Sequence, residues 1–322
     1  MDKIKLGVIG VGYLGKFHAR KYAAMADVDL VGVADTNPDF AAAVAKDCNT
    51  KPFADFSELL KEVDAVSVVA PTSLHHQIGR ICLEAGVDVM MEKPMTTTLE
   101  EADDLIAIAA AKKLIIQVGH IERYNPAVLA MAEHLTQPIF IESHRIHEFK
   151  PRGIDVDVVL DLMIHDIDII LSVVNSPIRT IHTVGVPVFT PTTDIANARL
   201  IFENGCTANI TVSRISKGNQ RRLRIFQPKS YISLDYGKKE IMVIKLTGEV
   251  DENLIPREEV IKSCFIEKDA LEMELADFVN NVRNRTTPKV CGNQGRLALA
   301  VAQEIMAQIK CHAEQHRQLL QD

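Results

Sequence analysis

The stretch that decides the fold is Lys5-Leu-Gly-Val-Ile-Gly10-Val-Gly-Tyr-Leu-Gly15, near the start of the chain. An apolar strand runs into three glycines at GxGxxG spacing, and helical periodicity follows over residues 16–25. Such glycines allow a tight turn, a close approach of a pyrophosphate and close packing of helix on strand. The helix N-terminus then faces the phosphates. We therefore expect a dinucleotide at this turn, held by Gly10, Gly12, Tyr13, Leu14 and Gly15.

An acidic residue follows at the distance expected for a ribose contact. The next apolar run, residues 29–34, is followed directly by Asp35, which lies twenty positions after Gly15. An acid at this point hydrogen-bonds the ribose hydroxyls of NAD, whereas a nearby arginine accommodates the 2′-phosphate of NADP. Thr36 follows, with no arginine beside it. The expected cofactor is therefore NAD, with Asp35 and Thr36 among its contacts.

Composition argues against several classes of protein. A chain of 322 residues, 47% of them hydrophobic, favours two domains. The formal net charge of -7 argues against nucleic-acid binding, which needs a basic surface. The six cysteines are scattered singly, as expected for reduced thiols in a cytoplasmic protein that binds no metal. We find no signal-peptide pattern and no apolar run of the roughly 18 residues that a membrane span needs.

The first 121 residues alternate short apolar runs with helical periodicity, which is typical of a parallel sheet covered by helices. Strands are expected at residues 3–9, 29–34, 51–53, 65–70, 87–91 and 114–118, and helices at 38–47, 56–62, 75–85 and 99–112. This pattern predicts an α/β fold in which residues 1–121 form a Rossmann domain with a doubly wound parallel sheet.

Residues 122–322 follow a different pattern. Helices are expected at 126–135 and 156–174, a strand at 139–149, and consecutive strands from 178 to about 246. Consecutive strands are typical of antiparallel sheets, so we predict an α+β domain with an open, largely antiparallel sheet. Helical periodicity returns at 270–284 and 294–316, and the final helix could pack back on the nucleotide domain.

Polar residues follow two of the expected parallel strands. Pro71, Thr72 and His75 follow the fourth strand, and Glu92-Lys93-Pro94 follows the fifth. Ligands of open parallel sheets bind outside the carboxyl ends of the strands, so both groups should border the dinucleotide. Lys93 could anchor a substrate hydroxyl or transfer a proton. A surface lysine paired with Glu92 is an equally good interpretation.

A polar stripe marks the long apolar helix. Asp161, His165 and Asp168 are spaced i, i+4 and i+7, so they share one helix face. Histidine exchanges protons near neutral pH, and a carboxylate one turn away can orient it or bind substrate. A solvent-facing stripe is the alternative, and a metal site is a weaker one because further ligands cannot be placed.

The junction between the two expected domains carries Gly119-His-Ile-Glu-Arg-Tyr-Asn-Pro126. Clefts between domains are preferred sites for small molecules, so Arg123 or Asn125 could contact the substrate. His120 reads better as a core histidine. Further on, Arg221, Arg222 and Arg224 form a basic run in an expected strand, where they could meet a diphosphate, solvent or a neighbouring subunit.

With these motifs in their order, the chain resembles the Gfo/Idh/MocA family, which includes glucose-fructose oxidoreductase and inositol dehydrogenase. The resemblance rests on the glycine turn, residues 71–75, Glu92-Lys93-Pro94, Gly119-His120, Asp161-x-x-x-His165 and a late Val290-Cys-Gly-Asn-Gln-Gly-Arg-Leu stretch. It implies that Lys93 anchors substrate and takes part in catalysis, that Asp161 binds substrate and that His165 is the general base. It also implies that residues 122–322 bind substrate and form homodimers or homotetramers.

Residues 155–168, together with residues 119–126, resemble the subgroup that acts on UDP-N-acetylglucosamine. Those enzymes oxidise the sugar 3-hydroxyl to a ketone, and a partner aminotransferase then makes the 3-amino sugar used in lipid A. Residues 152–157 depart from the glycine-rich stretch that family members often carry there. Dehydrogenases of UDP-hexosaminuronic acids or of free polyols such as inositol share much of the pattern. From other classes, a non-catalytic NAD-binding regulator and an NAD-using hydrolase or isomerase stay open.

Overall fold

The computed structural model describes residues 2–149 and 156–319, and it divides the chain into two compact units. The first unit contains Met1–Ile121 and Asp269–Leu297, and the second contains Glu122–Lys268 and Ala298–Asp322. Each unit has its own hydrophobic core. The units are described separately below.

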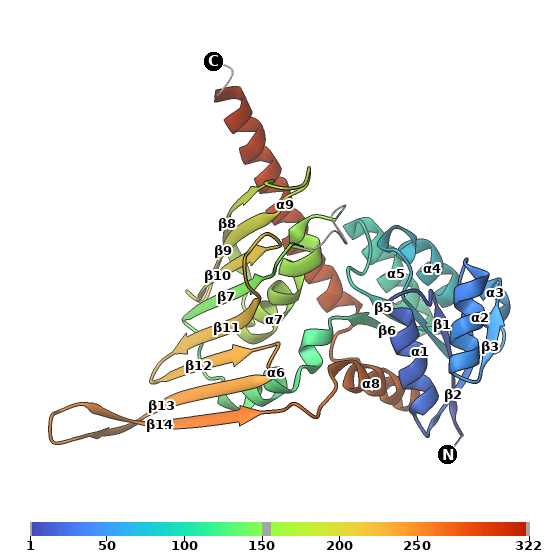
Figure 1. The fold of residues 1–322 in the computed structure, drawn as a ribbon, viewed down its shortest axis with the longest axis horizontal. Helices are drawn as coiled ribbons and strands as arrows, with labels where there is room; N and C mark the ends of the chain where they lie inside the picture. Colours follow the sequence, from blue (N-terminus) through green and yellow to red (C-terminus); the bar gives the residue numbers. More distant parts are fainter. Residues whose placement is uncertain (1, 150–155, 320–322) are drawn as a thin grey trace. The chain divides into compact units, whose positions relative to one another are not determined.

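The first unit is built on a six-stranded parallel sheet in the order β3-β2-β1-β4-β5-β6 (Figure 1). This is the doubly wound Rossmann order, so the predicted fold class is confirmed. The strands are β1 (Ile4–Ile9), β2 (Val28–Ala34), β3 (Lys51–Phe53), β4 (Ala65–Val68), β5 (Asp88–Glu92) and β6 (Ile116–Gly119). The helices between them are α1 (Gly15–Ala24), α2 (Pro38–Asp47), α3 (Phe56–Leu59), α4 (His75–Glu84) and α5 (Leu99–Lys112).

Helix α8 (Ala270–Asn284) completes this unit from near the other end of the chain. Its Leu275 and Phe278 are fully buried and join one core cluster with Leu6 and Tyr22. The sequence division, which places everything after residue 121 in the second domain, differs from the structure here. The final helix α9 (Gly292–Leu319) contributes only residues up to Leu297 to the first unit. The amphipathic period of α8 predicts a helix, but it does not say which core the apolar face covers.

The second unit carries an eight-stranded sheet in the order β14-β13-β12-β11-β7-β10-β9-β8 (Figure 1). All neighbours are antiparallel except β10 and β7, which are parallel, so the expected antiparallel character is confirmed. The strands are β7 (Phe140–Ile146), β8 (Ile178–Val186), β9 (Ile195–Phe202), β10 (Thr207–Ser213), β11 (Gln220–Gln227), β12 (Ser230–Asp235), β13 (Glu240–Val250) and β14 (Pro256–Cys264).

Helices cover one face of this sheet. Helix α6 (Pro126–Met131), helix α7 (Ile164–Val174) and the second-unit part of α9 share a core with every other residue of the strands. Alternation explains the pattern, because successive strand side chains point to opposite faces. Ile141, Leu223 and Leu234 are fully buried on the helix side. The neighbours of these residues along the strands lie on the other face.

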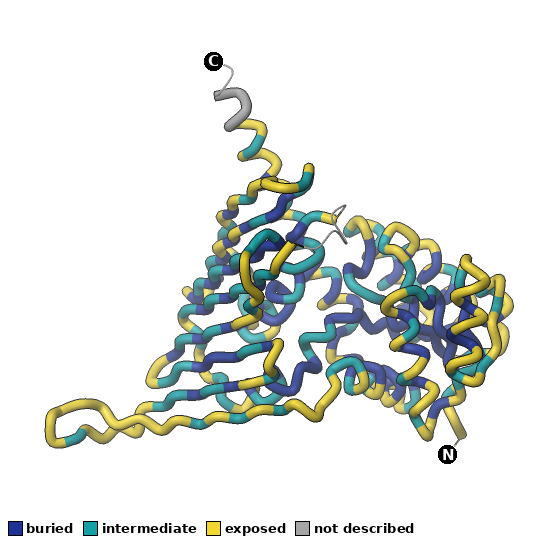
Figure 2. The backbone as a smooth tube through the Cα atoms, viewed as in Figure 1, coloured by how far each residue is buried: buried dark blue, intermediate teal, exposed yellow. Residues whose placement is uncertain are grey.

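Two local expectations differ from the structure. The helix expected over 156–174 begins as a π-helical turn, Val159–Met163, and only then becomes α7. Strand β14 has no counterpart in the sequence prediction. Its sequence, PREEVIKSC, lacks apolar alternation because both faces of the ribbon are largely exposed, as Figure 2 shows for the β13–β14 hairpin. Among the described residues, none of the helices is both long enough and apolar enough for a bilayer crossing.

Candidate active site

The glycine turn has the geometry that a bound pyrophosphate needs. Gly10 has a φ of +85°, and a Cβ there would lie 2.7 Å from the carbonyl oxygen of Val69. A Cβ on Gly15 would lie 1.8 Å from the carbonyl oxygen of Gly10, so only glycine allows α1 to start this close to β1. A Cβ on Gly12 would meet nothing within 4 Å. The open space above Gly12 indicates that this glycine admits a cofactor phosphate and is not required for packing within the protein.

A cavity of about 410 Å³ opens beside the turn. Its walls are apolar side chains together with the strand ends of β1, β2 and β4, where the fold places ligands. The lining includes Gly10, Gly12, Asp35, Thr36, Phe40, Pro71, Leu74 and Ile78. The cavity therefore brings together five of the residues that the sequence assigns to the cofactor: Gly10, Gly12, Asp35, Thr36 and Pro71.

Asp35 is held rigidly at the edge of this cavity. Its Oδ2 accepts a hydrogen bond from the Val11 amide at 2.8 Å, and its Oδ1 accepts one from the Asn37 amide at 2.8 Å. Each carboxylate oxygen keeps a second lone pair for a ligand hydroxyl. The contact with Val11 also ties Asp35 to the glycine turn itself.

His75, which the sequence predicts to contact the cofactor, is held by two backbone carbonyl groups. The ring is 1% exposed, with Nδ1 2.9 Å from the carbonyl oxygen of Pro94 and Nε2 2.8 Å from that of Ala70. Both nitrogens thus face backbone oxygens of the two strand-end loops. His75 thus joins these two loops. Thr72 starts the short 3₁₀ turn Thr72–Leu74 that precedes it.

Glu92 is the last residue of β5, and Lys93, which follows it, is half-buried. The Glu92 carboxylate lies 3.2 Å from His18 Nε2 and accepts a hydrogen bond from the Lys93 amide at 3.1 Å. Burial by itself raises the pKa of Glu92, but the His18 hydrogen bond and the charges of His18 and Lys93 outweigh it and lower that pKa. Glu92 is half-buried, and His18 is a partner that sequence reasoning missed.

In the second unit, the predicted polar stripe separates into two parts. Asp161 and His165 are half-buried on the π-helical turn and the first turn of α7. Asp168 is 2% exposed and forms a bidentate pair with Arg123, whose Nε and Nη2 lie 2.7 and 3.2 Å from its oxygens. π-Helical turns occur frequently at functional sites. Asp161 and His165 remain the pair with side chains that can meet a ligand.

Two residues expected to contact substrate make contacts within the protein. Arg123 is engaged by Asp168, as described above. Asn125 is 4% exposed and caps α6, with its Oδ1 accepting from the Ala127 amide and its Nδ2 donating to Glu122 and to the Tyr236 carbonyl. His120 is 1% exposed, as the core interpretation requires. The sequence motif around residues 119–126 is thus explained mainly by packing.

A buried ionic cluster surrounds Asp166, the residue after His165. Asp166 is fully buried and accepts hydrogen bonds from Arg145 Nε at 2.6 Å and Ser143 Oγ at 2.8 Å. Arg145 also lies 2.9 Å from Glu122, and its guanidinium is 4.9 Å from the centre of the Tyr236 ring. Burial lowers the pKa of Arg145, but Asp166 and Glu122 more than compensate, so its pKa is raised. The cluster fixes the rotation of α7 about its axis.

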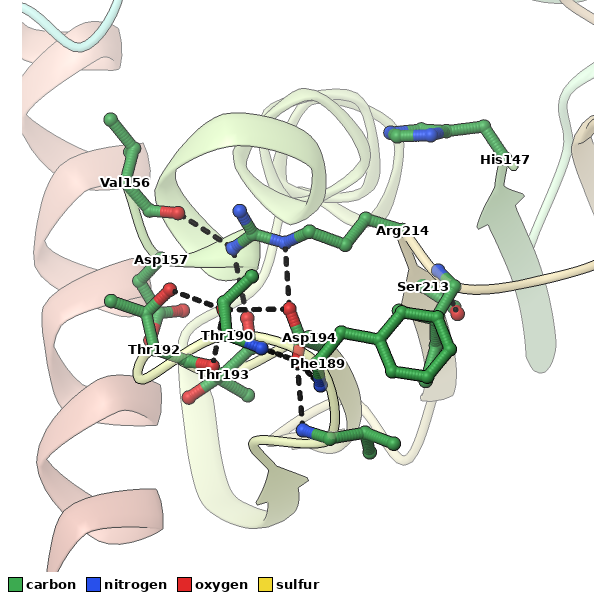
Figure 3. A network of polar contacts seen from close by, with 12 residues as sticks. His147, Val156, Asp157, Phe189, Thr190, Thr192, Thr193, Asp194, Ser213 and Arg214 are labelled. Carbon is green, nitrogen blue, oxygen red and sulfur yellow. Dashed lines mark hydrogen bonds and ion pairs between the residues drawn. The ribbon is translucent and has the colours of Figure 1, made fainter. Parts of the chain in front are cut away.

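A second network holds the start of the same helix (Figure 3). Asp194 is fully buried and accepts from the amides of Val188, Phe189 and Thr190 at 2.6 to 2.9 Å. Arg214 lies 3.5 Å from Asp194 and donates to the carbonyl oxygens of Val156 and Thr193 at 2.6 and 2.9 Å. The loop after β8 is thereby tied to the chain just before Asp161. Residues 152 and 155 of the motif discussed above lie outside the described residues.

Arg222 and Arg224 of β11 lie on the open face of the sheet, whereas Arg221 falls on the other face, opposite Arg145 in the strand register. Arg222 donates to Ser233 Oγ at 3.1 Å, and Arg224 pairs with Glu142 on the neighbouring strand. Arg221 is exposed. Within the described ranges, no group of three or more histidine, cysteine or acidic side chains is arranged to hold a metal ion.

Comparisons with known proteins agree with this geometry. Residues 4–120 match the NAD-binding Rossmann domain of the Gfo/Idh/MocA oxidoreductases, and residues 134–233 match the C-terminal domain of the same family. The chain belongs to this family. The resemblance inferred from the motifs is confirmed, and so is NAD as the cofactor.

Named relatives of the family share the whole length of the chain. UDP-N-acetylglucosamine 3-dehydrogenase of Acidithiobacillus ferrooxidans is 37% identical over 312 residues, which cover 96% of this chain and 98% of that protein. A solved structure of that enzyme superposes with a TM-score of 0.90 and covers 97% and 99% of the two chains at 36% identity. Myo-inositol 2-dehydrogenase of Thermotoga maritima is 26% identical over 92% of this chain and 93% of its own length. The chain is thus an oxidoreductase of the Gfo/Idh/MocA type, and not merely an NAD-binding regulator.

Proposed function

We propose that this oxidoreductase oxidises the 3-hydroxyl of UDP-N-acetylglucosamine to a ketone with NAD as the acceptor. The observation that carries the proposal is the 37% identity over almost the full length of both chains to a UDP-N-acetylglucosamine 3-dehydrogenase. The inositol dehydrogenase relative is less similar, at 26%. The presence of Lys93, Asp161 and His165 supplies the groups that alcohol oxidation requires.

Oxidation of an alcohol removes one proton from oxygen and one hydride from carbon. We assign the proton to His165, whose imidazole can accept it near neutral pH, and assign Asp161 to binding the sugar and orienting that ring. Lys93 holds the substrate oxygen through its ammonium. Bound NAD supplies the hydride acceptor. Gly10, Gly12, Gly15, Asp35 and Thr36 hold its phosphates and adenosine, and Tyr13, Leu14, Pro71, Thr72 and Glu92 border it.

A panel of candidate substrates tests this proposal. We expect NADH absorbance to rise with UDP-N-acetylglucosamine, and mass spectrometry to show a product that has lost two hydrogens. UDP-N-acetylhexosaminuronic acids and free myo-inositol are the informative competitors. Faster turnover of either one assigns the enzyme to a different substrate class. Conversion of a UDP-sugar without accumulation of NADH indicates an isomerase or hydrolase in which the cofactor is regenerated.

Cofactor choice depends on Asp35. We expect the wild type to show a higher kcat/KM with NAD than with NADP, because the fixed carboxylate bonds the ribose hydroxyls and repels a 2′-phosphate. The variant Asp35→Ser should lose most of that preference. Steady-state kinetics with both cofactors measure the ratio, and Asp39→Ser, which changes an exposed acid in the first turn of α2, is the control. A wild-type preference for NADP would remove the role assigned to Asp35.

We propose that the second unit also forms a homodimer or homotetramer through the open face of its sheet. A cross-strand row on that face is apolar, and β-sheet register places its members side by side: Phe140, Phe226, Tyr231, Ile244 and Val260. The rings of Phe140 and Phe226 stack with their centroids 5.6 Å apart, and the ring centroids of Phe226 and Tyr231 are 5.0 Å apart. Exposed apolar patches commonly mark interfaces.

Light scattering tests this interface. The mass of the wild type should be a multiple of the chain mass, and Phe226→Glu should reduce that mass. A monomeric wild type would contradict the proposed oligomer.

The same proposal places the enzyme in a pathway. A 3-keto sugar nucleotide is the substrate that an aminotransferase needs to make a 3-amino sugar, and lipid A precursors use such a sugar. A cytoplasmic location fits the cysteines, since all six are free thiols. Conversion of the product by an added aminotransferase and amino donor would support this placement.

A further inference from the structure

The side chain of Glu92 is enclosed on three sides at the end of β5. His18 Nε2 lies 3.2 Å from Oε1, and the Lys93 amide donates to Oε2 at 3.1 Å. On the third side is Gly119 of β6, where a Cβ would approach the carboxyl carbon and both oxygens to 3.1 Å. These three neighbours define the position of the carboxylate, which in turn accepts a hydrogen bond from the Lys93 backbone.

His18 is dedicated to this contact. It comes from α1, three residues after the last glycine of the turn, and is 2% exposed. Its Nδ1 is buried and has no hydrogen-bond partner within the described part of the chain. The ring's polar contact is therefore made through Nε2 to Glu92. Burial of a polar ring costs free energy, and the contact with Glu92 is the one that offsets this cost for His18.

The loop is held on its far side by His75, which lies 2.9 Å from the Pro94 carbonyl oxygen. Residues 92 and 94 are thus each fixed by a buried histidine, with Lys93 between them. His75 comes from α4 and His18 from α1, so two helices locate one residue. Of these two histidines, only His18 contacts the Glu92 side chain, which accepts a hydrogen bond from the Lys93 amide.

We propose that His18 is a positioning residue that sets the location of Lys93 through the Glu92 carboxylate. The inference rests on the proposed function, in which Lys93 holds the substrate oxygen. A displacement of about 1 Å at a reacting group can cost about a hundredfold in rate. Because α1 begins at the glycine turn, the same helix that holds the cofactor phosphates also places Lys93. His18 belongs to no motif that the sequence analysis recognised.

Substitution of His18 tests the proposal. We expect His18→Leu to lower kcat about tenfold to a hundredfold while KM for NAD changes little, because the phosphate contacts are untouched. His18→Gln, whose amide can reach the position of Nε2, should restore much of the lost kcat. The matched control is Tyr22→Phe, one turn further along the same buried helix, which removes a 2.8 Å hydrogen bond to Ser67. An equal loss of kcat in Tyr22→Phe would mean that general damage to α1 explains the effect.

A second variant approaches Glu92 from the opposite side. Gly119→Ala leaves His18 and Lys93 intact but crowds the carboxylate, so it should lower kcat in the same way as His18→Leu. Unchanged kcat in both variants, with the folded state verified by circular dichroism, overturns the proposal.

Chemical labelling of Lys93 separates this proposal from the proposed function. The rate at which a lysine reagent modifies Lys93, followed by peptide mass spectrometry, needs no substrate. It should rise in His18→Leu and Gly119→Ala but not in Tyr22→Phe. An inactive wild type would remove the proposed function and leave this measurement intact, whereas equal labelling rates in all four proteins would remove the positioning role.

Discussion

Replacement of His165 by asparagine, or of Lys93 by methionine, is expected to lower kcat by about a hundredfold to ten thousandfold, the range typical of general acid-base residues. Asparagine keeps the approximate size and polarity of histidine but cannot accept a proton. Methionine keeps the length of lysine but cannot bond a hydroxyl. Stopped assays of product formation with saturating NAD measure both losses.

The contrast with NAD binding makes this test specific. Neither substitution changes the glycine turn or Asp35, so NAD titrations should give nearly unchanged affinity. His182→Asn is a matched control, because this histidine is exposed on β8. Near-normal turnover in both the His165 and the Lys93 variants would contradict the assigned mechanism.

Replacement of Arg145 by methionine is expected to destabilise the second unit by about 3 to 5 kcal/mol. Arg145 is 4% exposed and lies against the fully buried Asp166 and the nearly buried Glu122, so its loss leaves two carboxylates without their cation. Urea unfolding followed by circular dichroism measures the shift of the transition midpoint.

Arg224→Met is the comparison that separates the effect of burial on stability from the effect of losing a positive charge. Arg224 pairs with Glu142, but the two side chains are 35% and 27% exposed. Pairs that water reaches contribute at most about 1 kcal/mol, so this variant should stay close to the wild type. Similar losses from both substitutions would mean that burial of the Arg145 cluster does not decide its contribution.

The sequence predicts those features that depend on local spacing. The glycine turn and Asp35 follow from motif distance, and the doubly wound parallel sheet follows from the alternation of strands with helices. The place of Lys93 after the fifth strand and that of His165 on a helix follow in the same way. The open antiparallel sheet follows from repeated strands between turn signals. Strand β14 is not predicted, because an exposed ribbon has no apolar period to detect.

Contacts between distant residues are beyond the reach of such patterns. Arg123 and Asn125 look like ligands in the sequence, yet Asp168 and the first turn of α6 engage them. Asp166 falls outside the polar stripe, yet it is fully buried and paired with Arg145. His18 and Glu92 are separated by 74 residues (92 minus 18), and spacing in the sequence gives no sign that they meet.

Helix α8 has a consequence for the order in which the protein can be completed on the ribosome. Tyr22 and Leu6 are among the first residues synthesised, but their cover includes Phe278 from α8. At about 5 to 20 residues per second, those residues wait roughly 10 to 50 seconds for the helix. During that interval the nascent nucleotide-binding unit exposes apolar surface, which is what chaperones bind. A fragment ending before residue 269 should therefore aggregate rather than fold, however complete its Rossmann sheet.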